Sequence, residues 1–331
     1  MAKKRKISGL SGIELMQACT ALKRLRSSLV EEEEEEEEET VDQVQDNLPD
    51  SLKDMISKLE SRLSGPQTLN FSRVDAETLK RLNIVQQRGL IIKSGAEERS
   101  EKSKLIGKDE LWSSTNMQLH LALLDKLVSK ENEATCRAWI DTFFFRASAM
   151  VDPGKSMVLN MEQVIPATAI SPTSMATISG FTDYAAVVTE SRAAAVYRKV
   201  PRVETARLHE TGFFVTEAKK GPLYDHVPQA VCQLYASGKQ LEKDTIRGAL
   251  TNGHEWMFII LSFNKDGNGA SYKYSIPLEY RKTRTPNEET PEQSSPDVIA
   301  CILLEWIQKS FQDLDTDDWF EEIAKSGSLA K

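Results

Sequence analysis

Residues 213–219 read Phe-Phe-Val-Thr-Glu-Ala-Lys, a short run whose composition and spacing predict a β-strand. Side chains two residues apart on a strand point to the same face of the sheet. Glu217 and Lys219 therefore share a face with Val215, and the strand ends with a carboxylate and an amine side by side.

A second stretch, residues 179–184, reads Ser-Gly-Phe-Thr-Asp-Tyr and places Asp183 at the start of another predicted strand. Strands of this length pair with a neighbour to satisfy their backbone groups. If the strand after Asp183 pairs with residues 213–217, two carboxylates and one amine meet at one end of a sheet.

The residues around these two stretches predict an α/β (or α+β) domain with a mixed central sheet flanked by helices. Short apolar runs predict strands at Met157–Ile165, Ala176–Ile178, Tyr184–Val188, Phe213–Glu217, Trp256–Phe263 and Tyr272–Leu278. Helical spacing predicts helices near 117–127, from Glu131 to Pro153, after Pro228, and from Ile299 to Phe311. Trp256–Phe263 is the longest apolar run and is expected near the centre of the sheet.

The N-terminal third differs in composition, and three segments follow from this difference. Residues 1–50 comprise a basic start, a helix and an acidic linker that contains nine consecutive glutamates at 31–39. Residues 51–113 are predicted to form a helical extension, and residues 114–331 the folded domain.

The formal net charge is −8, but the glutamate run accounts for it, because the rest of the chain is close to neutral. Between residues 191 and 220 basic side chains outnumber acidic ones. That excess is either an ordinary solvated face or a surface that follows a phosphate backbone.

The chain contains four widely spaced cysteines and no apolar run long enough for a membrane span. No apolar segment follows the basic N-terminus, so no secretory signal is expected, and the interpretation is an intracellular protein with reduced thiols. Lys3-Lys4-Arg5-Lys6 matches a short nuclear-import signal, although a lysine cluster without a role is an open alternative.

Two carboxylates and a lysine on rigid strands suit phosphodiester cleavage. A divalent cation offsets charge on phosphoryl oxygens and acidifies a water molecule, and Mg²⁺ binds carboxylate oxygens while keeping several waters. A neighbouring lysine orients the attacking water and stabilises developing charge.

This arrangement resembles the PD-(D/E)XK superfamily of restriction-endonuclease-like nucleases, with Asp183 and Glu217-Ala218-Lys219 matching its signature. The resemblance also implies Glu133 from the preceding helix as a metal ligand and Gln229 from the following helix as a catalytic residue. It covers about half of the chain and extends to nuclease-like domains of fungal Crinkler-type effectors. It implies Mg²⁺ or Mn²⁺ as cofactor and nucleic acid, with DNA favoured, as substrate.

Two features depart from that pattern: Thr182 precedes Asp183 where proline is usual, and Glu217 follows Asp183 by 34 positions, which implies an inserted hairpin or loop. The alternative function is an inactive nuclease-fold module that binds partners through the N-terminal helices and the acidic run. Glu133 equally suits a solvated position paired with Arg137 at i+4. Tyr235 is expected in the core, and His254 in a loop.

Overall fold

The structure is a computed structural model that describes residues 18–25, 52–53, 55–56, 68–129, 132–169, 176–207, 212–280 and 293–323. The chain divides into two units, 1–67 and 68–331. In the first unit residues 18–25 are helical. Lys3-Lys4-Arg5-Lys6 and the glutamate run lie outside the described residues.

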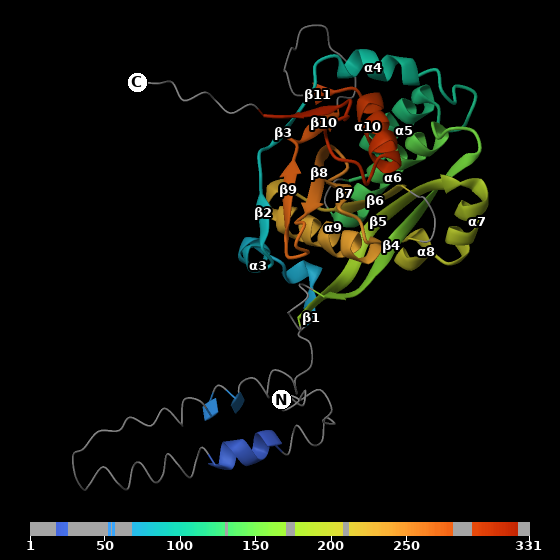
Figure 1. Cartoon of the computed structure of the whole chain (residues 1–331). Helices are drawn as coiled ribbons and strands as arrows, with labels where there is room; N and C mark the ends of the chain where they lie inside the picture. Colours follow the sequence, from blue (N-terminus) through green and yellow to red (C-terminus); the bar gives the residue numbers. More distant parts are fainter. Residues whose placement is uncertain are drawn as a thin grey trace, which may run out of the picture. The chain divides into compact units, whose positions relative to one another are not determined.

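The second unit holds a sheet of ten strands in its described part, and two further strands form a small separate pair (Figure 1). The strands are β1 Thr68–Asn70, β2 Ile84–Gln86, β3 Leu90–Ile92, β4 Lys155–Ala169, β5 Thr177–Glu190, β6 Gly212–Ala218, β7 Thr245–Thr251, β8 Glu255–Phe263, β9 Ala270–Tyr274, β10 Leu278–Tyr280, β11 Gln293–Ser294 and β12 Phe320–Glu322. The helices are α3 Ala76–Arg81, α4 Ala96–Ser103, α5 Ser114–Leu127, α6 Glu133–Ala149, α7 Ser191–Lys199, α8 Val203–Arg207, α9 Val227–Leu241 and α10 Pro296–Gln308, with 3₁₀ turns η2 Phe71–Arg73 and η3 Leu223–His226.

The central strands run in the order β5, β6, β7, β8. β6 and β7 are parallel, whereas β5–β6 and β7–β8 are antiparallel. Every residue of β6 and β7 is buried, because helices cover both faces, as expected for an apolar strand between two layers. The predicted mixed sheet flanked by helices is confirmed.

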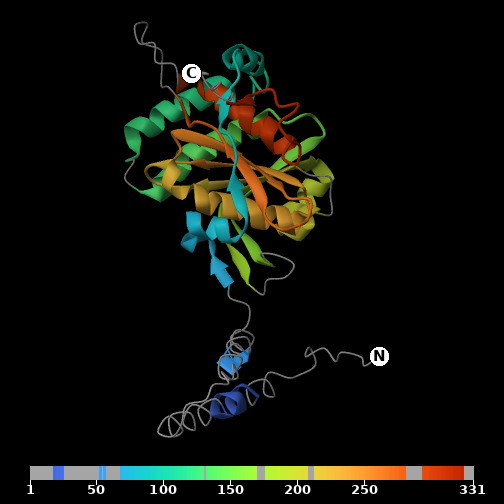
Figure 2. The ribbon, with the colours of Figure 1, turned by 60° about the vertical axis from the view of Figure 1, so that its left-hand side comes forward.

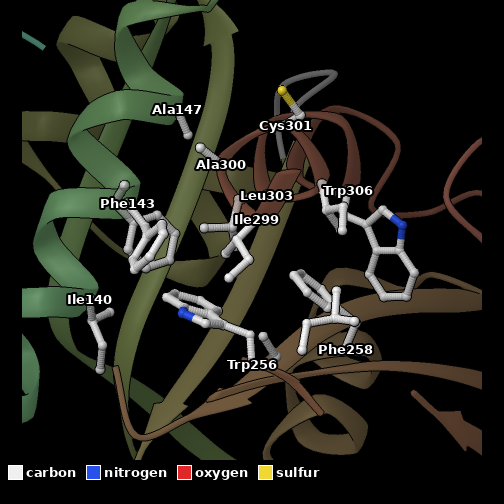
Figure 3. Packing of buried hydrophobic residues seen from close by; sticks show 14 of the residues in the cluster. Ile140, Phe143, Ala147, Trp256, Phe258, Ile299, Ala300, Cys301, Leu303 and Trp306 are labelled. Carbon is white, nitrogen blue, oxygen red and sulfur yellow. The ribbon is translucent and has the colours of Figure 1, made fainter. Parts of the chain in front are cut away.

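Two hydrophobic clusters lie on opposite faces of the sheet, with α9 over one face and α6 and α10 over the other (Figure 2). On the second face Phe143 of α6 contacts Trp256 of β8 edge-on, with ring centroids 5.3 Å apart. Phe258 and Trp306 pack in the same way at 5.3 Å. Figure 3 shows these rings meeting Ile299 and Leu303 of α10, so aromatic packing joins both helices to the sheet.

Several predicted boundaries differ from the structure. The separate strands expected at 176–178 and 184–188 form one strand, β5, because β4 pairs with it from Thr177 to Glu190. Asp183 therefore lies within a strand rather than at its start. The expected hairpin or loop between Asp183 and Glu217 contains helices α7 and α8. Strand β7 was not predicted, and it pairs with β8, whose other edge meets β9 and β10 as a central strand requires.

The segment 51–113, predicted as a helical extension, also differs. Its residues from Thr68 onward belong to the second unit, and β1 and β2 join the main sheet beside β5 and β9. β3 pairs with β12 near the C-terminus. Short strands that pair with distant partners carry little local signal, so periodicity did not reveal them.

Candidate functional site

Asp183 lies where β5 and β6 stop pairing. The last pair of that ladder is Tyr184 with Thr216, so Asp183 and Glu217 are the next residues on the two adjacent strands. Beyond this last pair, the Asp183 side chain still joins β5 to β6, because its Oδ2 accepts a hydrogen bond of 2.8 Å from the backbone N–H of Ala218. Its Oδ1 accepts one of 2.7 Å from Arg137 Nη2 on α6. Both carboxylate oxygens are thus held in fixed directions.

Glu217 is the most enclosed acidic group of the site, with a side chain only 3% exposed. Its Oε1 lies 2.7 Å from Lys219 Nζ and accepts from Gln229, while Oε2 accepts from Gln233. The two glutamines lie four residues apart on α9, so they share one helix face. Burial, and then the negative charge of Asp183, raises the pKa of Glu217 to about 7.

Lys219 connects two acidic groups, as its Nζ lies 2.7 Å from Glu217 Oε1 and 3.5 Å from Glu133 Oε2. Its side chain is 15% exposed. Burial opposes the charged form of this amine, but the carboxylates of Glu217, Glu133 and Asp183 together outweigh burial, and the pKa of Lys219 is raised. Lys219 is therefore a charged amine between two carboxylates, and it lies beside Glu217 as the predicted strand spacing requires.

Glu133 begins α6, directly after the N-cap residue Asn132, whose side chain accepts from the Thr135 N–H. Its side chain is 43% exposed. The structure places Glu133 beside Lys219, whereas Arg137, one turn later, pairs with Asp183 and Glu162. Glu133 and Arg137 therefore do not pair with each other as the alternative expected. Glu133 pairs with Lys219 after β6, and Arg137 pairs with Asp183 of β5 and Glu162 of β4.

Three residues of the site were missing from the predicted set: Arg137, Glu162 and Gln233. Gln233 shares the predicted helix with Gln229, and its buried amide binds Glu217 as directly. Glu162 of β4 lies between the register pairs Met161–Tyr184 and Gln163–Thr182, and is therefore opposite Asp183, with a positive φ of 56°. Nothing in the sequence near Glu162 indicates this position, since it depends on how β4 pairs with β5.

Two further predictions concern residues outside the site. Tyr235 is buried and packs on Phe263, with ring centroids 5.2 Å apart, as expected of a core residue. His254 follows the turn after β7 and stacks on Tyr280, with centroids 5.4 Å apart.

Six charged side chains form the group that we call the site cluster: Glu133, Arg137, Glu162, Asp183, Glu217 and Lys219. Four carboxylates against two cations leave a formal charge of −2. Such an excess beside a buried carboxylate is unfavourable unless a cation offsets it.

Carboxylate oxygens are the ligands that Mg²⁺ and Mn²⁺ prefer, and each oxygen has a second lone pair beyond the hydrogen bond it accepts. The donor chemistry and the charge of the site cluster therefore fit a divalent cation held by Asp183 and Glu217. Within the described residues, no three His, Cys, Asp or Glu side chains stand close enough together to enclose a metal on their own. A cation here would keep water ligands, as Mg²⁺ commonly does.

Among the described residues, every helix is too short or too polar to cross a bilayer. Comparison with protein-family models and with curated proteins finds no match for this chain. A proposal for the function of this chain therefore rests on the geometry of the site cluster.

Proposed function

We propose that this chain is a divalent-metal-dependent nuclease of the PD-(D/E)XK type that hydrolyses phosphodiester bonds in nucleic acid, with DNA favoured. One observation carries the proposal: Asp183 and Glu217 stand next to each other on adjacent strands, with Lys219 Nζ 2.7 Å from Glu217. The formal charge of −2 on the site cluster is equal in size and opposite in sign to that of a divalent cation, and this supports the proposal. Localisation to the nucleus through Lys3-Lys4-Arg5-Lys6 is part of the same proposal.

Each side chain has a stated role in this mechanism. Asp183 and Glu217 would hold Mg²⁺ or Mn²⁺, which when bound offsets phosphoryl charge and acidifies a water. Lys219, a charged amine, donates hydrogen bonds that orient the attacking water and stabilise the developing negative charge. Gln229 and Gln233 fix the orientation of the Glu217 carboxylate, and Glu133 holds the Lys219 side chain in place.

Cleavage of plasmid and single-stranded DNA in the presence of Mg²⁺ tests the proposal. Lys219→Ala and Asp183→Asn should each lower the rate by about 100- to 1000-fold, since each removes a group that acts on the transition state. Lys220→Ala is the matched control, because Lys220 is an exposed neighbour of the same charge and should change the rate less than about twofold. Equal rates in all four proteins, or no cleavage by the wild type, would reject the nuclease.

A second function is favoured by one observation, the 2.7 Å contact of Arg137 with Asp183. A guanidinium at that oxygen already neutralises one carboxylate, as in an inactive nuclease fold that serves as a binding module. In that case the N-terminal helices and the acidic run would recruit partners, and the domain would bind no divalent cation.

A further inference from the structure

A large aromatic side chain lies exposed beside the site cluster. Phe181 of β5 is 63% exposed, two residues before Asp183. Val164 of β4 lies opposite Phe181 in the strand register and is 54% exposed. Since isolated exposed apolar residues are common, the position of this pair, about 7 Å of strand from Asp183, is the informative feature.

The backbone of Phe181 is fixed by the same helix that fixes Glu217. The Phe181 carbonyl accepts a hydrogen bond of 3.1 Å from Gln233 Nε2, and that amide also donates to Glu217 Oε2. The preceding Gly180 has φ +153°, and a Cβ there would come within 2.7 Å of the Phe71 ring. Phe181 is therefore carried on rigid backbone that is tied directly to the site cluster.

Two cationic side chains pair with the acidic residues that follow Phe181 on β5 and lie opposite on β6. Arg137 Nη2 lies 2.7 Å from the carboxylate of Asp183, two residues after Phe181, and Lys219 Nζ lies 2.7 Å from Glu217 on the neighbouring strand. An exposed ring next to cationic groups is the combination that binds single-stranded nucleic acid, because bases stack on the ring while phosphates meet the charges. In a duplex the base faces are already stacked on each other and are not available to a side chain.

We infer that Phe181 and Val164 form a stacking platform for an unpaired base of single-stranded nucleic acid whose neighbouring phosphate lies at Asp183 and Glu217. This inference rests on the proposed function and narrows its substrate to single strands or frayed ends. Phe181 is a specificity-determining residue here, since it would select unpaired bases and take no part in bond cleavage.

The experiment measures binding separately from cleavage. Fluorescence anisotropy gives Kd for a labelled oligothymidine and for a blunt hairpin duplex, with Ca²⁺ in place of Mg²⁺ and intact DNA confirmed on a gel. Phe181→Ala should weaken oligothymidine binding about tenfold and duplex binding less than about twofold. Phe181→Leu should lose as much as the alanine variant, because it keeps apolar bulk without a ring, whereas Phe181→Trp should bind at least as tightly as wild type.

Leu119→Ala is the matched control, because Leu119 is an exposed apolar residue on α5 and should leave both affinities unchanged. Unchanged oligothymidine affinity in Phe181→Ala, or an equal loss on both DNAs, overturns the platform whatever the cleavage assay gives. Full affinity in Phe181→Leu also overturns it, because apolar bulk without a ring would then be enough to bind the oligothymidine. Phe181-dependent binding by a chain that never cleaves DNA keeps the platform and rejects the nuclease.

Discussion

Two groups of buried charge in this domain differ in their balance. Arg247 of β7 and Asp317 are both fully buried and pair at 2.6 Å, one cation with one anion. Backbone carbonyls of Gln312 and Asp313 accept hydrogen bonds from Arg247 Nε and Nη2, and Asp317 accepts from the N–H groups of Trp319 and Phe320. This pair connects the segment after α10 to the sheet, and its two charges offset each other.

The site cluster is organised differently. It has two more carboxylates than cations, and it is partly open to solvent through Glu133, Glu162 and Arg137. A buried pair that is balanced and closed has a structural role, whereas a buried acidic excess that remains accessible is suited to binding a cation.

The largest effect is expected where the balanced pair is broken. Arg247→Met leaves the Asp317 carboxylate buried without its counter-ion, and the free energy of unfolding should fall by about 3–5 kcal/mol. Denaturation in urea measures this change. Lys309→Met, which breaks a half-buried pair with Glu305, is the control and should cost less than about 1 kcal/mol. A loss within 1 kcal/mol for Arg247→Met would contradict a structural role for the pair.

The next effect is the pH dependence of stability without divalent cations. The pKa of Glu217 rises from its ordinary value of 4.5 to about 7 in the folded chain, so between these values the folded state binds the extra proton. Its contribution to stability is full below pH 4.5 and is lost as pH rises through 7, on the order of 3 kcal/mol in total.

Urea midpoints measured in chelator from pH 5 to pH 8 should show this loss for wild type. Glu217→Gln, which does not titrate, should show a correspondingly flatter profile. The same slope in both proteins would mean that Glu217 does not titrate with a raised pKa in the folded chain.

A smaller effect is expected for the affinity of the site for divalent cations when Arg137 is changed. Arg137 binds the Asp183 carboxylate when no metal is present. Arg137→Ala removes a cation that competes for the carboxylates, and divalent-cation affinity should rise about five- to tenfold, the equivalent of one partly exposed ion pair. Titration with Mn²⁺ measures it. Arg207→Ala, whose exposed partner is Glu242, serves as control. Weaker binding in Arg137→Ala would show that the guanidinium supports the site instead of competing for it.

The smallest effect is expected at Glu133. Its contact with Lys219 is 3.5 Å long and its side chain is 43% exposed, so solvent screens the pair. Glu133→Gln should slow DNA cleavage by no more than about fivefold. A loss as large as that of Asp183→Asn would instead make Glu133 a direct metal ligand.

The sequence predicted the parts of the site that follow from local spacing. Glu217 and Lys219 share a face by the period of a strand, and Gln229 lies in the first turn of α9, which the sequence predicted from Pro228. The contacts of Arg137 and Glu162 could not be predicted from local spacing, because they depend on the pairing of β4 with β5.

The same limit explains the missed strand β7. Arg247 interrupts its apolar run, and the partner that allows a buried arginine there lies seventy residues later in the chain. Similarly, Asp183 appeared to begin a strand, because Gly180 and Thr182 suggested a break that the pairing with β4 overrides. Local patterns identified the elements, whereas long-range pairing decided their ends and their neighbours.

Calorimetric titration of the metal-free protein with Mn²⁺ measures whether the site cluster binds a divalent cation. We expect that wild type binds the cation and that Asp183→Asn and Glu217→Gln each lose that binding, whereas Asp225→Asn, which changes an exposed aspartate in η3, retains it. No binding by wild type, or equal binding by all four proteins, would contradict the claim that these carboxylates together hold a divalent cation.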